Sequence, residues 1–405
     1  MDTIHDPIRH LRYLRQSLSQ DNEAIGFFIS AGCPLSVSMP EGKWPLIPDV
    51  ANLSKFINTQ LKDNPEYKIL LDELGKAEKN IENIEDILSF LRSLLTVSKG
   101  GTVRGLTEIN LISLQHEICA EIVKKLNVSL PDKETPYHGL GNWIKSIDRR
   151  IAIELFTTNY DILMEQALED LEIPYFDGFT GSHRSFFDLR AVEDNLIPIH
   201  WSRLWKIHGS INWYQQLSAK QRKVFRSSEV RTEITLGEES HLIYPSHLKY
   251  EESRKMPYLA LIDQLSRFIR RKSSFLILSG YSFSDGHIND AIINALKANP
   301  TAMVLGLMFG TFNFDNGEER YPEAYRLAKN QHNLNIWTFD RAIIGTNIGK
   351  WINGKNPEDV ESEILDFIEK NENDENSNIV KLGDFLKFSH FLKRMIGSRG
   401  ANHVK

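Results

Sequence analysis

Cysteine is scarce in this sequence, which has two, Cys33 and Cys119, among 405 residues. Two cysteines cannot form a four-cysteine zinc site, and their separation excludes a C-x-x-C pair. A disulfide is not expected in a reducing cytoplasm. Both thiols are therefore interpreted as small buried apolar side chains, and no metal site is predicted.

Other absences narrow the function further. The sequence has no G-x-x-x-x-G-K-S/T loop and no G-x-G-x-x-G fingerprint, so ATP hydrolysis by this chain is not expected. It has no apolar run near the roughly 18 residues of a membrane helix, and no signal-peptide pattern at its start. A net charge of −6 and an isoelectric point near 6.1 do not indicate general affinity for nucleic acid. A cytoplasmic protein that contacts no membrane is predicted.

Short apolar runs alternate with helical patterns over most of the chain. This alternation predicts an α/β fold, a Rossmann-like doubly wound parallel sheet. The expected strands are 25–29, 152–158, 174–176, 204–207, 242–244, 274–278, 302–307 and 334–338. The expected helices around them are 7–19, 162–171, 257–271, 287–298 and 321–329.

A mainly helical region interrupts this pattern, with candidate helices at 50–61, 80–95, 107–126 and 137–147. The length of the chain suggests two or three domains. We therefore expect a Rossmann-like domain from residues 1–51 and 149–368, with a helical insertion at 52–148. Residues 369–405 are expected to form a charged linker and a C-terminal helix.

The most informative stretch is the polar turn Thr-Thr-Asn-Tyr-Asp, which runs from Thr157 to Asp161 after an expected buried strand. Open parallel sheets bind ligands at this edge. Asn159 and Asp161 can hydrogen-bond a ligand but are poor nucleophiles, so the turn indicates a site that positions something. Capping of the following helix would explain one of the two polar residues.

A second turn places His208 and Gly209 after the expected strand 204–207. Histidine can accept or donate a proton near neutral pH. A structural histidine at a strand end is the alternative interpretation. Gly209 favours a functional one, because it frees space around the ring.

The first expected strand ends in the small residues Ser30, Ala31, Gly32 and Cys33. A glycine in such a loop lets backbone amides approach a pyrophosphate closely. An ordinary strand-to-loop turn is the alternative.

A fourth turn, with Gly280, Tyr281 and Ser282, comes after the expected strand 274–278. Gly280 and Ser282 suit a ribose or a phosphate. Asp285, a few residues later, is a candidate cap for the next helix.

The four turns occur in an order that resembles the sirtuin superfamily, over about residues 24–52 and 151–345. The matching positions are Ala31 and Gly32 in an early Gly-Ala-Gly loop, Pro48 and Asp49 in the segment after it, Asn159 and Asp161 in an Asn-x-Asp turn, His208 and Gly209 in the His-Gly pair, and Gly280, Tyr281 and Ser282 in a Gly–hydroxyl loop. The residues of these motifs are most similar to those of the bacterial branch found in antiphage defence. The chain size resembles the sirtuin-like subunit that partners a HerA-type hexameric ATPase.

The resemblance implies that NAD⁺ binds as a substrate across the sheet edge. The chain is then expected to be an NAD⁺ glycohydrolase, which cleaves the bond between nicotinamide and ribose. Asn159 would hold the water or a ribose hydroxyl, His208 would be the general base, and Asp161 would orient the site or offset developing positive charge. Contacts to the dinucleotide would come from Ser30, Ala31, Gly32, Cys33, Pro48, Asp49, Thr158, Gly209, Gly280, Tyr281 and Ser282.

Two other functions stay open at this point. One is an NAD-dependent protein deacylase, although the helical region stands where protein deacetylases have a zinc ribbon. The other is a non-catalytic nucleotide-sensing scaffold. The resemblance also implies a homo-oligomer that assembles with a HerA-type ATPase, contacts nucleic acid only through that partner, and acts as an effector of antiphage defence.

Overall fold

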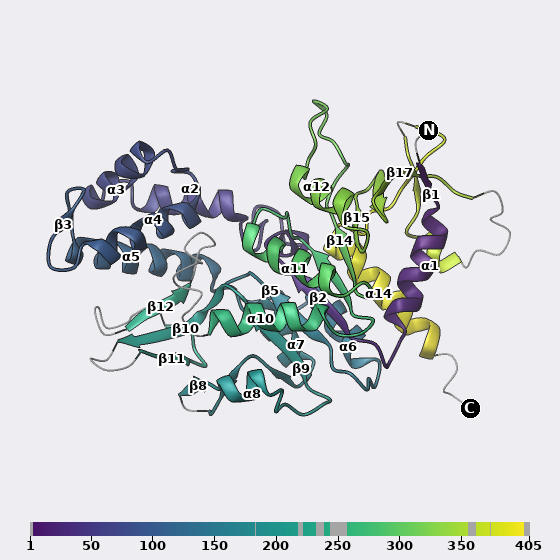
Figure 1. Cartoon of the computed structure of the whole chain (residues 1–405), viewed down its shortest axis with the longest axis horizontal. Coiled ribbons are helices and arrows are strands. Elements are labelled where there is room, and N and C mark those ends of the chain that lie inside the picture. The colour runs from purple at the N-terminus through teal and green to yellow at the C-terminus, as the bar shows by residue number, and fades with distance from the viewer. Residues whose placement is uncertain are drawn as a thin grey trace.

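A ten-stranded sheet forms the centre of the computed structural model, which describes residues 3–182, 184–217, 222–231, 239–243, 257–354, 362–372 and 374–400 (Figure 1). The strand order is β1-β17-β16-β15-β14-β13-β2-β5-β9-β6, and the run from β15 to β6 is parallel. The strands are β1 (Thr3–His5), β2 (Ile25–Ile29), β5 (Glu154–Thr157), β6 (Tyr175–Phe176), β9 (Ser202–Lys206), β13 (Phe275–Ser279), β14 (Met303–Leu307), β15 (Leu334–Trp337), β16 (Arg341–Ile344) and β17 (Asn347–Trp351). The predicted α/β class, a Rossmann-like doubly wound sheet with an inserted mainly helical region, is confirmed.

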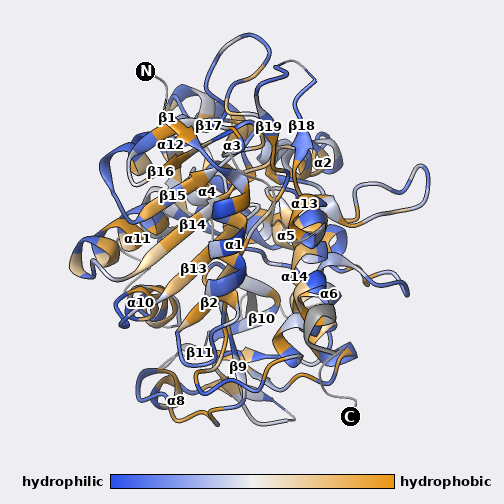
Figure 2. Ribbon diagram, turned by 90° about the vertical axis from the view of Figure 1, so that its right-hand side faces the viewer, coloured by the Kyte–Doolittle hydropathy of each residue, from blue (hydrophilic) through white to orange (hydrophobic). Residues whose placement is uncertain are grey.

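Helices cover both faces of this sheet, and the strands alternate their side chains between the two layers. In β2, Phe27 belongs to one apolar core and Phe28 to the other. Figure 2 shows the central strands as an apolar band between the helices. The layer on the Phe27 side contains α1 (Pro7–Leu18), α6 (Pro136–Lys145), α7 (Leu163–Asp170) and α14 (Phe385–Gly400). The layer on the Phe28 side contains α8 (Leu189–Glu193), α10 (Tyr258–Ile269), α11 (Gly286–Ala298) and α12 (Pro322–Asn330).

The helical region lies between β2 and β5, which are neighbours in the sheet. It contains α2 (Val50–Gln60), α3 (Pro65–Lys76), α4 (Ile84–Val97) and α5 (Glu108–Leu126), with a hairpin of β3 (Thr102–Val103) and β4 (Leu106–Thr107). Helix α3 was not predicted, because its buried face is narrow and rests on Tyr67, Leu70 and Leu74. The helices α2–α5 stand out to one side of the main sheet in Figure 1.

A second sheet, of order β12-β10-β11-β8-β7, is formed by two strands that precede β9 in the chain and three that follow it. Its strands are β7 (Phe179–Thr180), β8 (Ser185–Phe187), β10 (Gly209–Leu217), β11 (Arg222–Arg226) and β12 (Glu239–Ile243). The sequence predicted only a strand at 242–244 here, and Tyr244 lies outside the described residues. Strands of two or three residues, such as β7 and β8, are too short to show a period-2 pattern.

The C-terminal part returns to the main core. After α13 (Ser362–Leu365), the stretch predicted as a charged linker contains β18 (Glu369–Lys370) and β19 (Asn378–Ile379), which pair antiparallel. Helix α14 then packs against α6. A Cβ on Gly139 would lie 1.9 Å from Ser389 Oγ, so glycine at this position lets the two helices approach closely. Phe388 of α14 and Trp143 of α6 both contact the Phe27 ring.

Among the described residues, no helix combines the length and the apolar character that a bilayer crossing requires.

Candidate functional site

The four polar turns come directly after four adjacent strands, in the order β13-β2-β5-β9. At the ends of these strands Ser279 is in register with Ile29, Ile29 with Thr157, and Thr157 with Lys206. The next segments of the chain therefore meet at one edge of the sheet. Asn159 stands two residues beyond β5 and His208 two residues beyond β9.

The turn after β5 is held by its own hydroxyl groups. The Asn159 amide donates to Thr157 Oγ1 at 3.0 Å. Thr158 Oγ1 lies 2.8 Å from Ser30 Oγ, which ties this turn to the loop after β2. The half-buried side-chain amide of Asn159 has no hydrogen-bond partner in the part of the chain that the structure describes. Its donor and acceptor are therefore available to a ligand.

Asp161 is buried just before Ile162, the N-cap residue of α7, and its Oδ1 accepts from the amide of Leu163, the first residue of this helix, at 3.0 Å. Burial raises the pKa of Asp161 to about 6, although the charge of Lys206 opposes this rise. The cap that the sequence offered as an alternative is therefore present. The predicted role of Asp161 in offsetting charge on a substrate stays a prediction.

The carboxylate that faces His208 belongs to Asp285. His208 Nε2 lies 3.1 Å from Asp285 Oδ2, and both side chains are less than one tenth exposed. The two atoms are within ion-pair range but are not aligned for a hydrogen bond. Asp285 Oδ1 also accepts from the His287 amide at 3.0 Å, so one side chain caps α11 and faces the histidine. The sequence identified the cap and missed the second contact, which no local pattern encodes.

Gly209 has φ of +88° and turns the chain from His208 into β10. The main chain of this corner is tied to the neighbouring turn, since the Ile211 amide donates to the Tyr160 carbonyl at 2.9 Å. The Tyr160 ring lies 6.4 Å from the His208 ring and packs on the apolar core shared with the helical region. His208 and Asn159 thus stand on two turns that are joined to each other.

The loop after β2 packs backbone to backbone on the loop after β13. A Cβ on Gly32 would lie 2.8 Å from Gly280 Cα, and a Cβ on Gly280 would lie 2.6 Å from the Cys33 nitrogen. Gly280 also has φ of +67°. Both positions therefore require glycine for contacts within the protein.

Most amides of the first loop already have partners. The Ser30 amide donates to the Ser279 carbonyl at 3.0 Å, the Gly32 amide to Gly280 at 3.0 Å and the Cys33 amide to Ser30 at 2.9 Å. The Ala31 amide has no hydrogen-bond partner among the described residues. Of the amides predicted to hold a pyrophosphate, this one remains available in the present conformation.

The Cys33 thiol is buried and donates to the Ser279 carbonyl at 3.2 Å. Burial raises the pKa of this thiol to about 12, so it stays protonated and unreactive at neutral pH. The interpretation of Cys33 as a small buried side chain agrees with this environment.

Two predicted contact residues after β13 point in opposite directions. The Tyr281 ring is buried 5.1 Å from the Phe28 ring, and its hydroxyl donates to Asn289 Oδ1 at 2.8 Å. Ser282 is exposed, with its Oγ 2.9 Å from Ser284 Oγ. Only Ser282 presents a side-chain group that a ligand at this edge can reach.

Pro48 and Asp49 belong to the start of the helical region. Asp49 caps α2 by accepting from the Asn52 amide at 2.8 Å. Within the described ranges, neither residue forms a hydrogen bond or ion pair with Asn159 or His208. The structure does not bring this pair into direct polar contact with the other predicted residues.

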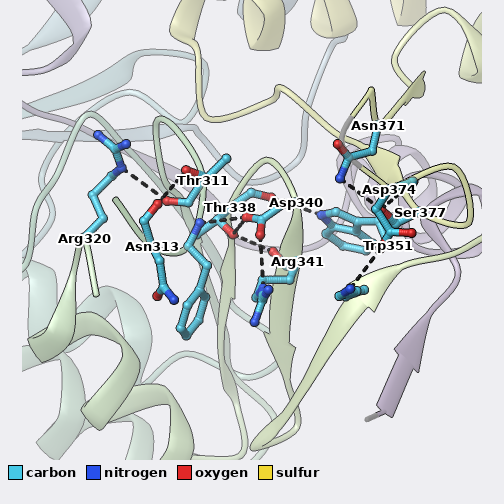
Figure 3. Close-up of polar contacts among 12 residues, drawn as sticks. Thr311, Asn313, Arg320, Thr338, Asp340, Arg341, Trp351, Asn371, Asp374 and Ser377 are labelled. Atoms are coloured by element: carbon cyan, nitrogen blue, oxygen red, sulfur yellow. Dashed lines mark hydrogen bonds and ion pairs between the residues drawn. The ribbon is translucent and has the colours of Figure 1, made fainter. Parts of the chain in front are cut away.

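The ends of β14 and β15, further along the same edge, carry a polar network that the sequence did not predict (Figure 3). Asp340 accepts from the Phe312 amide at 2.7 Å, from Thr338 Oγ1 at 3.2 Å and from Arg341 Nε at 3.1 Å. Arg320 Nε donates to the Thr311 carbonyl at 3.2 Å. These contacts fix the loops next to the Gly280 turn.

A metal centre is not evident, since the described residues contain no group of three or more histidine, cysteine, aspartate or glutamate side chains that could hold an ion.

The chain was compared with known families, proteins and structures. Residues 153–334, which include Asn159, His208 and Asp285, match the family model of a SIR2-like domain. No curated protein matches the chain. Among solved structures, one described as the structural basis for sirtuin substrate affinity has 14% identity and a TM-score of 0.34 and covers 76% of this chain and 90% of its own. A Sir2 mutant with a p53 peptide and NAD has 13% identity and a TM-score of 0.32, with the same coverage. Residues 153–334 are therefore similar to a SIR2-like domain, in line with the motif resemblance to the sirtuin superfamily.

Proposed function

We propose that this chain is an NAD⁺ glycohydrolase that cleaves the bond between nicotinamide and ribose. The SIR2-like domain supports an NAD-dependent enzyme. The observation that carries the proposal is the pairing of two groups on joined turns: the Asn159 side chain, which has no partner among the described residues, and His208, which a carboxylate faces at 3.1 Å. A site that only binds a nucleotide does not need a buried histidine backed by an aspartate.

Asn159 and His208 each take one part of the reaction. The bond from the nicotinamide nitrogen to ribose C1′ breaks, and nicotinamide leaves with the electron pair as a neutral molecule. Positive charge develops on the ribose, and the oxygen of water forms the new bond to C1′. Asn159 positions this water or a ribose hydroxyl, and His208 takes the proton that the water loses. The products are nicotinamide, ADP-ribose and one proton.

Asp285 has a defined part in this scheme. Its carboxylate faces Nε2 of His208, so a proton on Nε2 leaves Nδ1 as the basic nitrogen. When His208 gains the second proton, the carboxylate stabilises the imidazolium. Asp285 is in turn fixed by the amide at the start of α11.

The rest of the dinucleotide runs along the sheet edge from β5 toward β13. The Ala31 amide and the exposed hydroxyl of Ser282 are the groups that remain for its phosphates and adenosine. The resemblance to sirtuins supports this direction of binding.

The experiment is NAD⁺ turnover by the purified chain, with the products separated by chromatography. Asn159→Ala and His208→Ala should both lose nicotinamide release, by about 100- to 10,000-fold for the base, while the fold survives. Asn376→Ala and His332→Ala change the same residue types at exposed positions and should keep full turnover. Turnover that persists in both site variants would contradict the assignment.

The product identifies the alternatives. O-acetyl-ADP-ribose formed from an acetylated peptide would assign the chain as a deacylase. Binding of NAD⁺ without turnover, in the presence and absence of an ATPase partner, would assign it as a nucleotide-sensing scaffold.

We further propose that the chain assembles as a homo-oligomer with a HerA-type hexameric ATPase and acts as an antiphage effector. The motif resemblance supports this role, and exposed apolar side chains on α3, α4 and α5 are consistent with assembly: Ile69, Val97 and Ile109 are 40%, 70% and 76% exposed. Co-expression with the ATPase should give a stable co-purifying complex and lower phage plating. An intact chain that stays monomeric and unprotective in that setting would contradict this part.

A further inference from the structure

Lys206 is a fully buried lysine at the end of β9, two residues before His208. Its ammonium lies 2.7 Å from Glu165 Oε1 on α7. It also donates to the carbonyl of Asp161, which is two residues beyond Asn159. A buried ammonium is costly unless it is paired and hydrogen-bonded, so these contacts explain how the charge is tolerated.

The surroundings of Lys206 form a charge cluster, defined by Asp161, Glu165, Lys206 and Tyr137. Glu165 Oε2 and the Tyr137 hydroxyl are buried without hydrogen-bond partners among the described residues. Burial raises the pKa of Tyr137, and the charges of Asp161 and Glu165 raise it further. One ammonium therefore serves two acidic side chains that water does not reach.

The charge cluster lies directly beneath the two turns of the proposed site. The strand ladder between β5 and β9 ends where the Ile207 amide donates to the Thr157 carbonyl at 2.8 Å. Beyond that point, the segment after β9 contacts the Asn159 turn through the Ile211 amide and the Ser210 hydroxyl, which both donate to the Tyr160 carbonyl, and through the Lys206 ammonium, which donates to the Asp161 carbonyl. Lys206 supplies the charged contact of this set and the one to the Asp161 carbonyl.

We propose that Lys206 is a positioning residue, which sets the distance and orientation of Asn159 relative to His208 through the Asp161 carbonyl, with Glu165 holding the ammonium in place. This inference rests on the proposed NAD⁺ hydrolysis. Lys206 touches neither substrate nor reacting atoms, so it acts through the turn alone. Loss of its contact should therefore lower kcat and leave the KM for NAD⁺ nearly unchanged.

The test must separate positioning from stability. Lys206→Met alone leaves Glu165 as an unpaired buried carboxylate, so the melting temperature falls for that reason as well. The double variant K206M/E165M replaces the ion pair by two apolar side chains of similar length. It removes the unpaired Glu165 carboxylate and should recover part of the melting temperature, while the Asp161 carboxyl still lacks the ammonium. The double variant still lacks the donor to the Asp161 carbonyl, so kcat should stay reduced, by about 100-fold if the Asn159 turn shifts by about 1 Å.

Two further variants complete the design. Glu165→Gln keeps an acceptor for Lys206 and keeps the contact to Asp161, so kcat should remain close to that of the unmodified chain. Glu154→Gln alters another ion pair, between the buried Glu154 and the partly exposed Arg271, at the start of β5. It should change the melting temperature without changing kcat or KM. Recovery of kcat together with the melting temperature in K206M/E165M would overturn the positioning role.

A crystal structure of K206M/E165M distinguishes failure of this inference from failure of the proposed function. Displacement of Asn159 relative to His208 supports positioning even if the unmodified chain hydrolyses no NAD⁺, a result that would count against the proposed function alone. An Asn159 turn that stays in place in the double variant would refute the inference, whatever the unmodified chain does to NAD⁺.

Discussion

Gly32 and Gly280 touch through their backbones: a Cβ added to Gly32 would lie 2.8 Å from Gly280 Cα, and the Gly32 amide donates to the Gly280 carbonyl at 3.0 Å. Gly32, which suggested a phosphate-binding loop, is therefore required for a contact within the protein. The contact joins the loop after β2 to the loop after β13, which also carries the Asp285 carboxylate that faces His208.

Gly280→Ala should lower the free energy of unfolding by about 2–4 kcal/mol. A left-handed φ costs an alanine about 1 kcal/mol or more, and overlap with the Cys33 backbone adds about 1–3 kcal/mol. Gly42→Ala is the matched control, since Gly42 has φ of +75° and open space around it. Urea denaturation should show the control losing only the strain contribution. Equal losses in the two variants would mean that the contact with Gly32 has no cost of its own.

Asp285→Asn should lower kcat by about 10- to 100-fold, toward the lower end of what a general base typically contributes, because the carboxylate that faces His208 stabilises the imidazolium. Asparagine keeps the helix cap and removes the charge that faces His208. Asp188→Asn makes the same change at the cap of α8, remote from the site, and should leave kcat unaltered. The rate of nicotinamide release gives kcat for both variants. An Asp285→Asn enzyme with normal kcat would show that His208 works without its carboxylate.

Ionisation of the buried Asp161 carboxyl should lower the free energy of unfolding as the pH rises from about 4 to 6. Burial raises the pKa of this carboxyl to about 6, above its ordinary value of 3.8, so in this window the folded chain binds the proton more tightly than the unfolded chain. The stability penalty is absent below pH 4 and complete above pH 6. Asp161→Asn keeps the cap on α7 but cannot ionise. Its unfolding free energy relative to the unmodified chain should rise across this window by about 2–3 kcal/mol. A difference that stays constant with pH would be inconsistent with a raised pKa.

Gly139→Ala should loosen α14, because the new Cβ would lie 1.9 Å from Ser389 Oγ. We expect a loss of about 1–3 kcal/mol in unfolding free energy. Adding Ser389→Ala removes the overlapping oxygen and should restore part of this loss. Gly75→Ala, in the last turn of α3 with its nearest neighbour at 3.9 Å, should instead be neutral or stabilising by up to about 1 kcal/mol. Calorimetry gives the unfolding free energy of the two single variants and of the double variant.

Much of the sheet was predictable because parallel strands buried on both sides appear as short apolar runs. The expected strand 25–29 coincides with β2, and Asn159 and His208 were found because polar turns come directly after such runs. Most of the second sheet was not found, since strands as short as β7 carry no readable period. The strands β16 and β17, next to the edge strand β1, were missed because they form an antiparallel pair outside the strand–helix alternation.

The site was predictable only in part. An aspartate directly before a helix, such as Asp285, is explained by helix capping alone. The sequence therefore offered no reason to predict its second contact, with His208. Lys206 was read as a strand residue, because nothing local distinguishes a buried lysine from a surface one. Its partner, Glu165, lies 41 residues away in the chain. Contacts of this kind depend on the three-dimensional fold and leave no periodic trace.

Helix α14 is synthesised long after β2, and this delay affects how the chain packs during translation. Phe27 of β2 is made early, yet Phe388, which covers part of its ring, is made some 360 residues later. At typical rates of about 5–20 residues per second, this delay lasts tens of seconds. During that time β2, whose C-terminal loop borders the proposed site, lacks part of its apolar cover. A ribosome-bound chain should therefore be a poor NAD⁺ hydrolase, and one that exposes a surface for chaperones.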